Sequence, residues 1–141
     1  ARAVVSEDKE GSSAIICVHA NSVGFYITSG RLVEFSSTLA ISPDDTDSFA
    51  FLVTEEFKKV FNYWESKNSE ERNTAGKQAI KCFVCGKSDT AKRIESMMKK
   101  NQGVSASLAN VWTNAFSLEE YIPDISFEDS LRFGSAVGLF V

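Results

Sequence analysis

Three short runs of β-branched and aromatic residues in the first quarter of the chain constrain its fold more than any other feature. They cover residues 14–19, 23–28 and 31–36, and runs of this length and composition are typical of β-strands. Only Ser29 and Gly30 separate the second run from the third, and a two-residue gap that contains glycine favours a tight hairpin. We therefore predict an antiparallel meander of three strands at the start of the fold.

An amphipathic helix is predicted after the meander. Thr54 supplies a capping hydroxyl, and the helix is expected to run to about Lys67. The residues just before it, 48–53, are compatible with a fourth strand or with the entry to this helix. Apolar side chains recur at the spacing of one helical face, which predicts that this face packs on the core. They are Phe57, Val60, Phe61 and Trp64.

The next part of the chain predicts a strand, a glycine turn and a helix in succession. The strand covers residues 78–85, and Gly86 ends it. The helix is expected to begin at Ser88 or Asp89 and to end near Lys100. This order of elements indicates one strand–helix unit in the middle of the fold.

The C-terminal third is predicted to contain further strands and two short helices. Residues 104–116 alternate loosely between apolar and small or polar side chains, which indicates one long or two short strands. Residues 117–120 and 126–129 each have the composition of a helix start. Residues 134–141 are expected to form a small apolar strand.

Together these elements indicate an α+β fold, with a mostly antiparallel sheet of four to six strands and two main helices packed on one face. Residues 1–13 are mostly charged, small or polar and are expected to form a solvated N-terminal arm. Residues 14–141 are expected to form a single globular domain, since no repeat or second composition divides them. Because the first residue is Ala1 rather than methionine, we expect that an initiator, a targeting segment or a propeptide has been removed.

The charge balance limits the classes of partner. The chain has 19 acidic and 15 basic residues and a net charge of -4, which argues against broad binding to nucleic acid or to an anionic membrane surface. No apolar run approaches the ~20 residues of a membrane helix, so we expect a soluble protein. Because the chain is acidic and rich in aromatic residues, we expect its partner to be a protein. The cysteines number three, and an odd number favours reduced thiols in a reducing intracellular compartment over secretion.

The four soft ligands of the chain are the candidate metal or redox centre. They are Cys17, His19, Cys82 and Cys85. Cys82 and Cys85 have the C-x-x-C spacing of half a structural zinc site, which Cys17 and His19 would complete, and the same motif before a helix is compatible with thiol exchange. Against both readings, residues three apart on one strand face opposite sides. The cysteines are therefore interpreted first as small buried hydrophobes, and no cofactor is expected.

An acidic segment near the C-terminus, interspersed with aromatic and aliphatic residues, is the candidate interface, because apolar side chains with a polar rim are typical of docking surfaces. Its residues are Tyr121, Ile122, Asp124, Phe127 and Glu128.

No catalytic constellation is found in the sequence: His19 is the only histidine, and no serine lies in a G-x-S-x-G motif. We therefore predict that the chain is not an enzyme. The leading hypothesis is a protein–protein interaction or assembly module, such as an accessory subunit, an inhibitor or immunity-type protein, or a processed effector. The alternative is a protein that binds structural zinc or exchanges thiols through Cys82 and Cys85.

Overall fold

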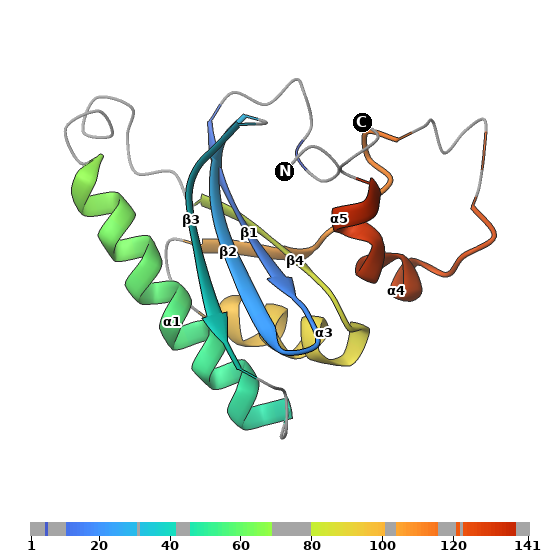
Figure 1. Ribbon diagram of the computed structural model, residues 1–141, viewed down its shortest axis with the longest axis horizontal. Coiled ribbons are helices and arrows are strands. Elements are labelled where there is room, and N and C mark those ends of the chain that lie inside the picture. Colours follow the sequence, from blue (N-terminus) through green and yellow to red (C-terminus); the bar gives the residue numbers. More distant parts are fainter. Residues whose placement is uncertain are drawn as a thin grey trace.

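A computed structural model describes residues 5, 11–30, 32–41, 46–68, 80–100, 104–115, 121 and 123–137 (Figure 1). These residues form a five-stranded sheet with helices packed against it, so the predicted α+β class is confirmed. The strands are β1 (Ser12–Val18), β2 (Ser22–Ser29), β3 (Leu32–Ala40), β4 (Ile80–Cys85) and β5 (Val104–Leu108). The helices are α1 (Thr46–Lys67), α3 (Ser88–Met98), α4 (Phe127–Ser130), the short 3-10 helix η1 (Leu131–Phe133) and α5 (Gly134–Val137).

The sheet is mixed, with the strand order β3-β2-β1-β4-β5. β1 pairs with β2 and β2 with β3 in antiparallel fashion, whereas β1 with β4 and β4 with β5 are parallel. The prediction of a mostly antiparallel sheet is therefore wrong. The reason is that α1 and α3 are crossover helices, which return the chain so that the following strand runs parallel to a strand already in place. β4 enters the sheet beside β1, on the side away from the meander (Figure 1).

The predicted meander is confirmed. β1, β2 and β3 follow one another in the sheet, and Gly30 takes the left-handed conformation in the second turn, with φ +54°. A register shift between Ile27 and Thr28 marks a β-bulge in the β2–β3 pair. On one side of this bulge the register is regular from Phe35 to Ala40, where β3 ends.

α1 begins at Thr46, eight residues before the predicted cap. Residues 48–53 are its first turns rather than a strand, because Phe49 and Val53 continue the buried helical stripe that Phe57 belongs to. Thr54 is not a cap: its hydroxyl lies inside the helix and donates a hydrogen bond of 2.8 Å to the carbonyl oxygen of Ala50. α1 and α3 contact each other, and α3 also contacts β4 and β5.

The C-terminal elements differ in part from the prediction. β5 occupies the first five residues of the segment predicted as strand, and residues 111–115 form turns. Ser126 caps α4, since its hydroxyl oxygen accepts a hydrogen bond of 3.1 Å from the backbone N–H of Asp129. Residues 134–137 are the helix α5 and not a strand. The predictions for residues 117–120 and 138–141 lie outside the described residues.

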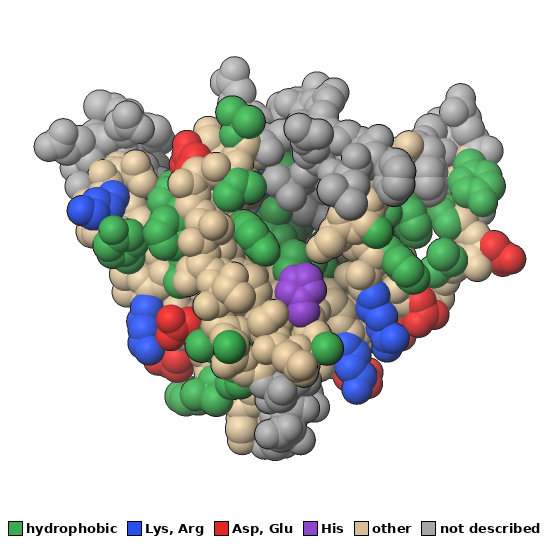
Figure 2. All heavy atoms as spheres, in the orientation of Figure 1, with side chains coloured by type: hydrophobic (Ala, Val, Ile, Leu, Met, Phe, Trp, Pro, Cys, Tyr) green, Lys and Arg blue, Asp and Glu red, His purple; other side chains and the backbone are tan. Residues whose placement is uncertain are grey.

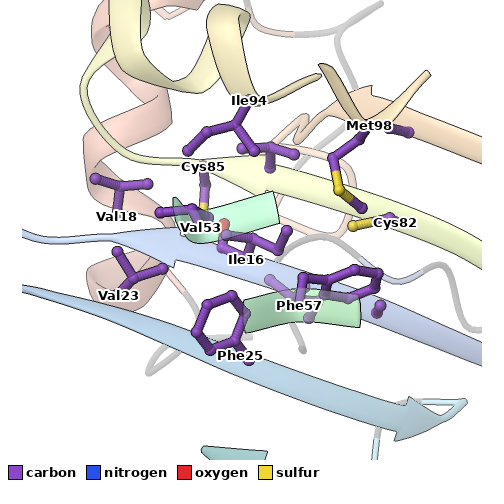
Figure 3. Packing of buried hydrophobic residues seen from close by; sticks show 14 of the residues in the cluster. Ile16, Val18, Val23, Phe25, Val53, Phe57, Cys82, Cys85, Ile94 and Met98 are labelled. Atoms are coloured by element: carbon purple, nitrogen blue, oxygen red, sulfur yellow. Dashed lines mark hydrogen bonds between the residues drawn. The ribbon is translucent and has the colours of Figure 1, made fainter. Parts of the chain in front are cut away.

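Side-chain alternation gives the sheet two distinct faces. The ring of Phe25 on β2 lies 6.5 Å, centroid to centroid, from that of Phe57 on α1, which defines the α1 face. Ile16 is paired with Phe25 and with Val84, so the side chains of all three point to this face. Figure 3 shows Val53 and Phe57 of α1 together with Ile94 and Met98 of α3 around Ile16 and Cys82. The largest part of the core therefore lies between the strands and these two helices.

Of the predicted N-terminal arm the structure describes residues 5 and 11–13, and Val5 belongs to the buried core cluster. Val5 is buried, and the side-chain amide of Asn114 donates a hydrogen bond of 2.6 Å to its carbonyl oxygen. β1 then begins at Ser12. Among the helices that the structure describes, none combines the length and the apolar character needed to cross a membrane.

Candidate functional site

The structure brings two of the four predicted soft ligands together. Cys17 near the end of β1 and Cys85 at the end of β4 are direct neighbours in the parallel register, and their Sγ atoms are 2.8 Å apart. Both alternate with residues of the α1 face, so both point to the opposite side of the sheet, which we call the thiol face. Cys17 is partly exposed and Cys85 is buried.

The other two predicted ligands lie elsewhere. Cys82 is two residues before Val84, so it faces α1, where it is fully buried. His19 is exposed in the turn after β1, and Figure 2 shows its side chain at the surface. Within the described ranges, no three His, Cys, Asp or Glu side chains gather closely enough to hold a metal ion. The C-x-x-C spacing thus places Cys82 and Cys85 on different faces, as the odd separation along one strand requires.

The hydrogen bond between the two thiols shifts their pKa values in opposite directions. A hydrogen bond donated by Cys85 favours the thiolate of Cys17 and lowers the pKa of Cys17. The same hydrogen bond, together with burial, raises the pKa of Cys85. Burial alone raises the pKa of Cys82. Of the three cysteines, Cys17 is therefore the one whose sulfur is both reachable and most easily deprotonated.

Tyr26 and Gly24 complete the surroundings of Cys17. Gly24 is paired with Cys17 across β1 and β2, and a Cβ atom at Gly24 would lie 2.6 Å from the hydroxyl oxygen of Tyr26. Because Gly24 has no side chain, the ring of Tyr26 can lie in the space above it. Burial, and to a smaller extent the nearby thiols, raises the pKa of Tyr26, so this hydroxyl keeps its proton. The sequence held one signal for this arrangement, since a glycine inside a strand indicates a close approach.

The predicted acidic interface is partly described. Tyr121, Asp124 and Phe127 are exposed, and Glu128 forms an ion pair with Lys92 of α3. Ile122 lies outside the described residues. Aromatic side chains are thus exposed among acidic residues in this segment, and one of the acidic residues also ties α4 to α3.

Another exposed apolar surface, which the sequence reasoning missed, lies at the β3 edge of the sheet. Leu32 is 76% exposed and Val33 51% exposed, both at the start of β3. Tyr63 of α1 is 54% exposed, and its ring lies 5.6 Å from that of Phe35 on β3. We call Leu32 and Val33, the two exposed residues at the start of β3, the edge surface. Figure 2 shows hydrophobic side chains along this side of the molecule, where Figure 1 places β3 and α1.

Comparisons with known proteins identify no family. No family model matches the chain, and no curated protein matches it. One similar solved structure is a Bacteroides thetaiotaomicron protein with an actin-like ATPase fold and unknown function, at 10% identity and a TM-score of 0.41, covering 67% of this chain and 31% of that one. Another is a PilM–PilN type IV pilus biogenesis complex, at 13% identity and a TM-score of 0.47, covering 90% of this chain and 45% of that one. The chain spans less than half the length of either structure, and both scores are below 0.5, so neither similarity supports a functional conclusion.

Proposed function

We propose that the chain is a non-catalytic protein–protein interaction or assembly module that binds an extended segment of a partner protein along β3. The observation that carries this proposal is the character of the edge strand. β3 is nine residues long, Glu34 is its only charged residue, it has no proline, and Leu32 and Val33 are exposed at its start. The proposed role needs no cofactor.

β3 is an edge strand, since within the described residues it pairs with β2 alone. An edge strand presents unpaired N–H and C=O groups, and proteins that stay apart from one another usually protect such edges with charges, proline, β-bulges or short length. In β3 the one charge, Glu34, and the one bulge lie together near its start, which leaves Phe35 to Ala40 without such protection. The other edge strand, β5, has only five residues, and its Ser105 and Ser107 side chains are exposed. The two edges therefore differ, and β3 offers the longer and more apolar template.

The regular part of β3 suits the addition of one more strand. From Phe35 to Ala40 its register with β2 has no irregularity, so backbone groups alternate regularly along the outer side. An added strand would gain its affinity from these backbone groups and its specificity from side chains. Leu32 and Val33 supply apolar contacts at the start of this strand.

Tyr121 and Phe127 offer a second surface for the same function. Both are exposed, and the acidic residues Asp124 and Glu128 lie between or beside them in the sequence. A partner bound there would contact a polar-rimmed aromatic patch rather than a strand edge. The two placements differ in which residues a partner contacts, so one experiment separates them.

The experiment captures partners from the native source with the wild-type chain and with three variants, and quantifies them by mass spectrometry. The Leu32→Lys/Val33→Lys variant places two charges on the edge surface, which opposes strand addition. Ser107→Lys on β5 is the matched control, and Tyr121→Lys/Phe127→Lys tests the second surface. We expect a stoichiometric partner that is lost only with Leu32→Lys/Val33→Lys.

Two results would count against the proposal. If the wild-type chain recovers no stoichiometric partner, an interaction role loses its support. If the partner is lost with Tyr121→Lys/Phe127→Lys and kept with Leu32→Lys/Val33→Lys, the interface lies in the C-terminal segment and not on β3.

A further inference from the structure

The thiol face contains a pair of cysteines that the C-x-x-C motif did not predict. Cys17 and Cys85 are contributed by two different strands, 68 residues apart in sequence, and their Sγ atoms are 2.8 Å apart. This separation is shorter than van der Waals contact between two sulfur atoms. The two sulfurs therefore form a hydrogen-bonded contact, and Cys85 is the donor when Cys17 is a thiolate.

The backbone geometry is compatible with a covalent bond between them. Paired residues on neighbouring strands lie about 4.8 Å apart, inside the window of about 4.4–6.8 Å that Cα atoms span in disulfides. A disulfide bond is about 2.0 Å long, so the sulfurs need to approach by only about 0.8 Å from their separation of 2.8 Å. Side-chain rotation is sufficient for such a movement, and the strands can stay in place.

The geometry points to Cys17 and Cys85 as a reversible dithiol–disulfide site that reacts with low-molecular-weight disulfides. This assignment is independent of the proposed binding role. β2 separates the pair from the edge strand β3. Cys82 takes no part, because it is fully buried on the α1 face.

The surroundings divide the roles of the two thiols. Cys17 is partly exposed, and the hydrogen bond from Cys85 lowers its pKa, so it is the attacking sulfur. Cys85 is buried, and a Cβ atom at Gly134 of α5 would lie 3.7 Å from its Sγ. The backbone of α5 thus covers Cys85, and a small disulfide reaches Cys17 first.

The reaction proceeds by two exchanges. The Cys17 thiolate attacks one sulfur of R–S–S–R, a mixed disulfide forms, and one R–S⁻ leaves. Cys85 then releases its proton, and its sulfur attacks Sγ of Cys17, so that the Cys17–Cys85 bond forms and the second R–S⁻ leaves. The two thiols lose two electrons and two protons, and R–S–S–R takes them up to become two R–SH.

The experiment incubates the full chain with oxidised glutathione, blocks the remaining thiols with N-ethylmaleimide, and maps the peptides without reduction. We expect the Cys17 peptide linked to the Cys85 peptide, with Cys82 alkylated only after unfolding. The link closes a long loop, so the oxidised chain should also melt about 10 °C higher than the reduced chain. Two results with the wild-type chain would overturn the assignment. One is alkylation of both Cys17 and Cys85, and the other is a disulfide link that includes Cys82.

Two variants test the division of roles. Cys82→Ala is the matched control and should form the same link as the wild-type chain. Cys85→Ala removes the second exchange, so the reaction should stop at one glutathione on Cys17. Because this variant also lacks the hydrogen bond that lowers the pKa of Cys17, the reaction should be slower than in the wild-type chain. Glutathione on Cys82 in place of Cys17 would contradict Cys17 as the attacking thiol. Because the wild-type mapping needs neither variant, a folding defect in Cys85→Ala leaves the main test intact.

Discussion

Gly86 allows a close approach of two backbone segments at the end of β4. Gly86 follows β4 with φ +126°, and a Cβ atom there would lie 2.5 Å from the carbonyl oxygen of Val18. Its N–H donates a hydrogen bond of 2.9 Å to the carbonyl oxygen of Leu131. Gly86 therefore fits between the end of β1 and η1, and it holds the C-terminal helices against the sheet.

Replacing Gly86 should destabilise the fold more than replacing Gly30. Both have positive φ, but a Cβ atom at Gly30 meets nothing within 4 Å, so Gly30→Ala should cost about 1 kcal/mol. Gly86→Ala adds a clash with backbone and should cost roughly 3–5 kcal/mol. Urea unfolding followed by circular dichroism measures both. Equal losses would show that the backbone near Val18 gives way easily.

At the scale of elements, α1 has two different faces. Phe57 and Trp64 are buried, and Phe57 contacts the rings of Phe25 and Phe61. Phe51, on the same helix, is exposed. The buried face fastens the helix to the sheet, and the exposed face contributes little to folding.

This contrast predicts unequal effects of the same substitution. Phe57→Ala leaves a cavity in the core and should lower the free energy of unfolding by about 3–5 kcal/mol. Phe51→Ala removes an exposed ring and should change it by less than about 0.5 kcal/mol. Thermal unfolding of both variants checks this. A large loss with Phe51→Ala would place that ring in a contact that the fold needs.

The elements also show which features a sequence predicts. Local patterns predicted the first three strands and the buried stripe of α1, because apolar spacing depends on nearby residues only. The start of α1 was missed because the apolar residues of 48–53 fit a strand as well as a helix, and because Thr54 has a side chain that also suits a cap. The hydroxyl instead bonds to Ala50.

Features that depend on distant residues could not be predicted in this way. The direction of β4 depends on where the crossover through α1 ends, which no local pattern states. The pairing of Cys17 with Cys85 follows from that placement. The exposure of Leu32 and Val33 was equally hidden, because β3 has one charge and no proline, so its composition does not mark it as an edge strand.

At the scale of the whole molecule, β1 is the centre of the sheet. It is paired with β2 on one side and with β4 on the other, whereas β3 has one partner strand in the described part of the chain. Opening of the molecule should therefore begin at the β3 side, where side chains are most exposed.

Hydrogen exchange measures this order directly. Amides of β1 and β4 should exchange at least about tenfold more slowly than those of β3, because β1 and β4 open only with most of the sheet. A bound partner strand should slow exchange in β3 and leave β1 unchanged. Protection in β3 equal to that in β1, without a partner, would mean that the edge is covered.

The parallel pairing of β1 with β4 has a consequence for how the polypeptide acquires its shape. The three strands of the meander are close in sequence and can assemble early, but the second neighbour of β1 begins at Ile80. Until Ile80 has been synthesised and α1 has packed on the sheet, an early meander has unpaired backbone groups along both outer strands and an exposed apolar face. Contacts between such distant residues form slowly. The nascent chain therefore passes through an interval in which association with another copy competes with completion of its own sheet.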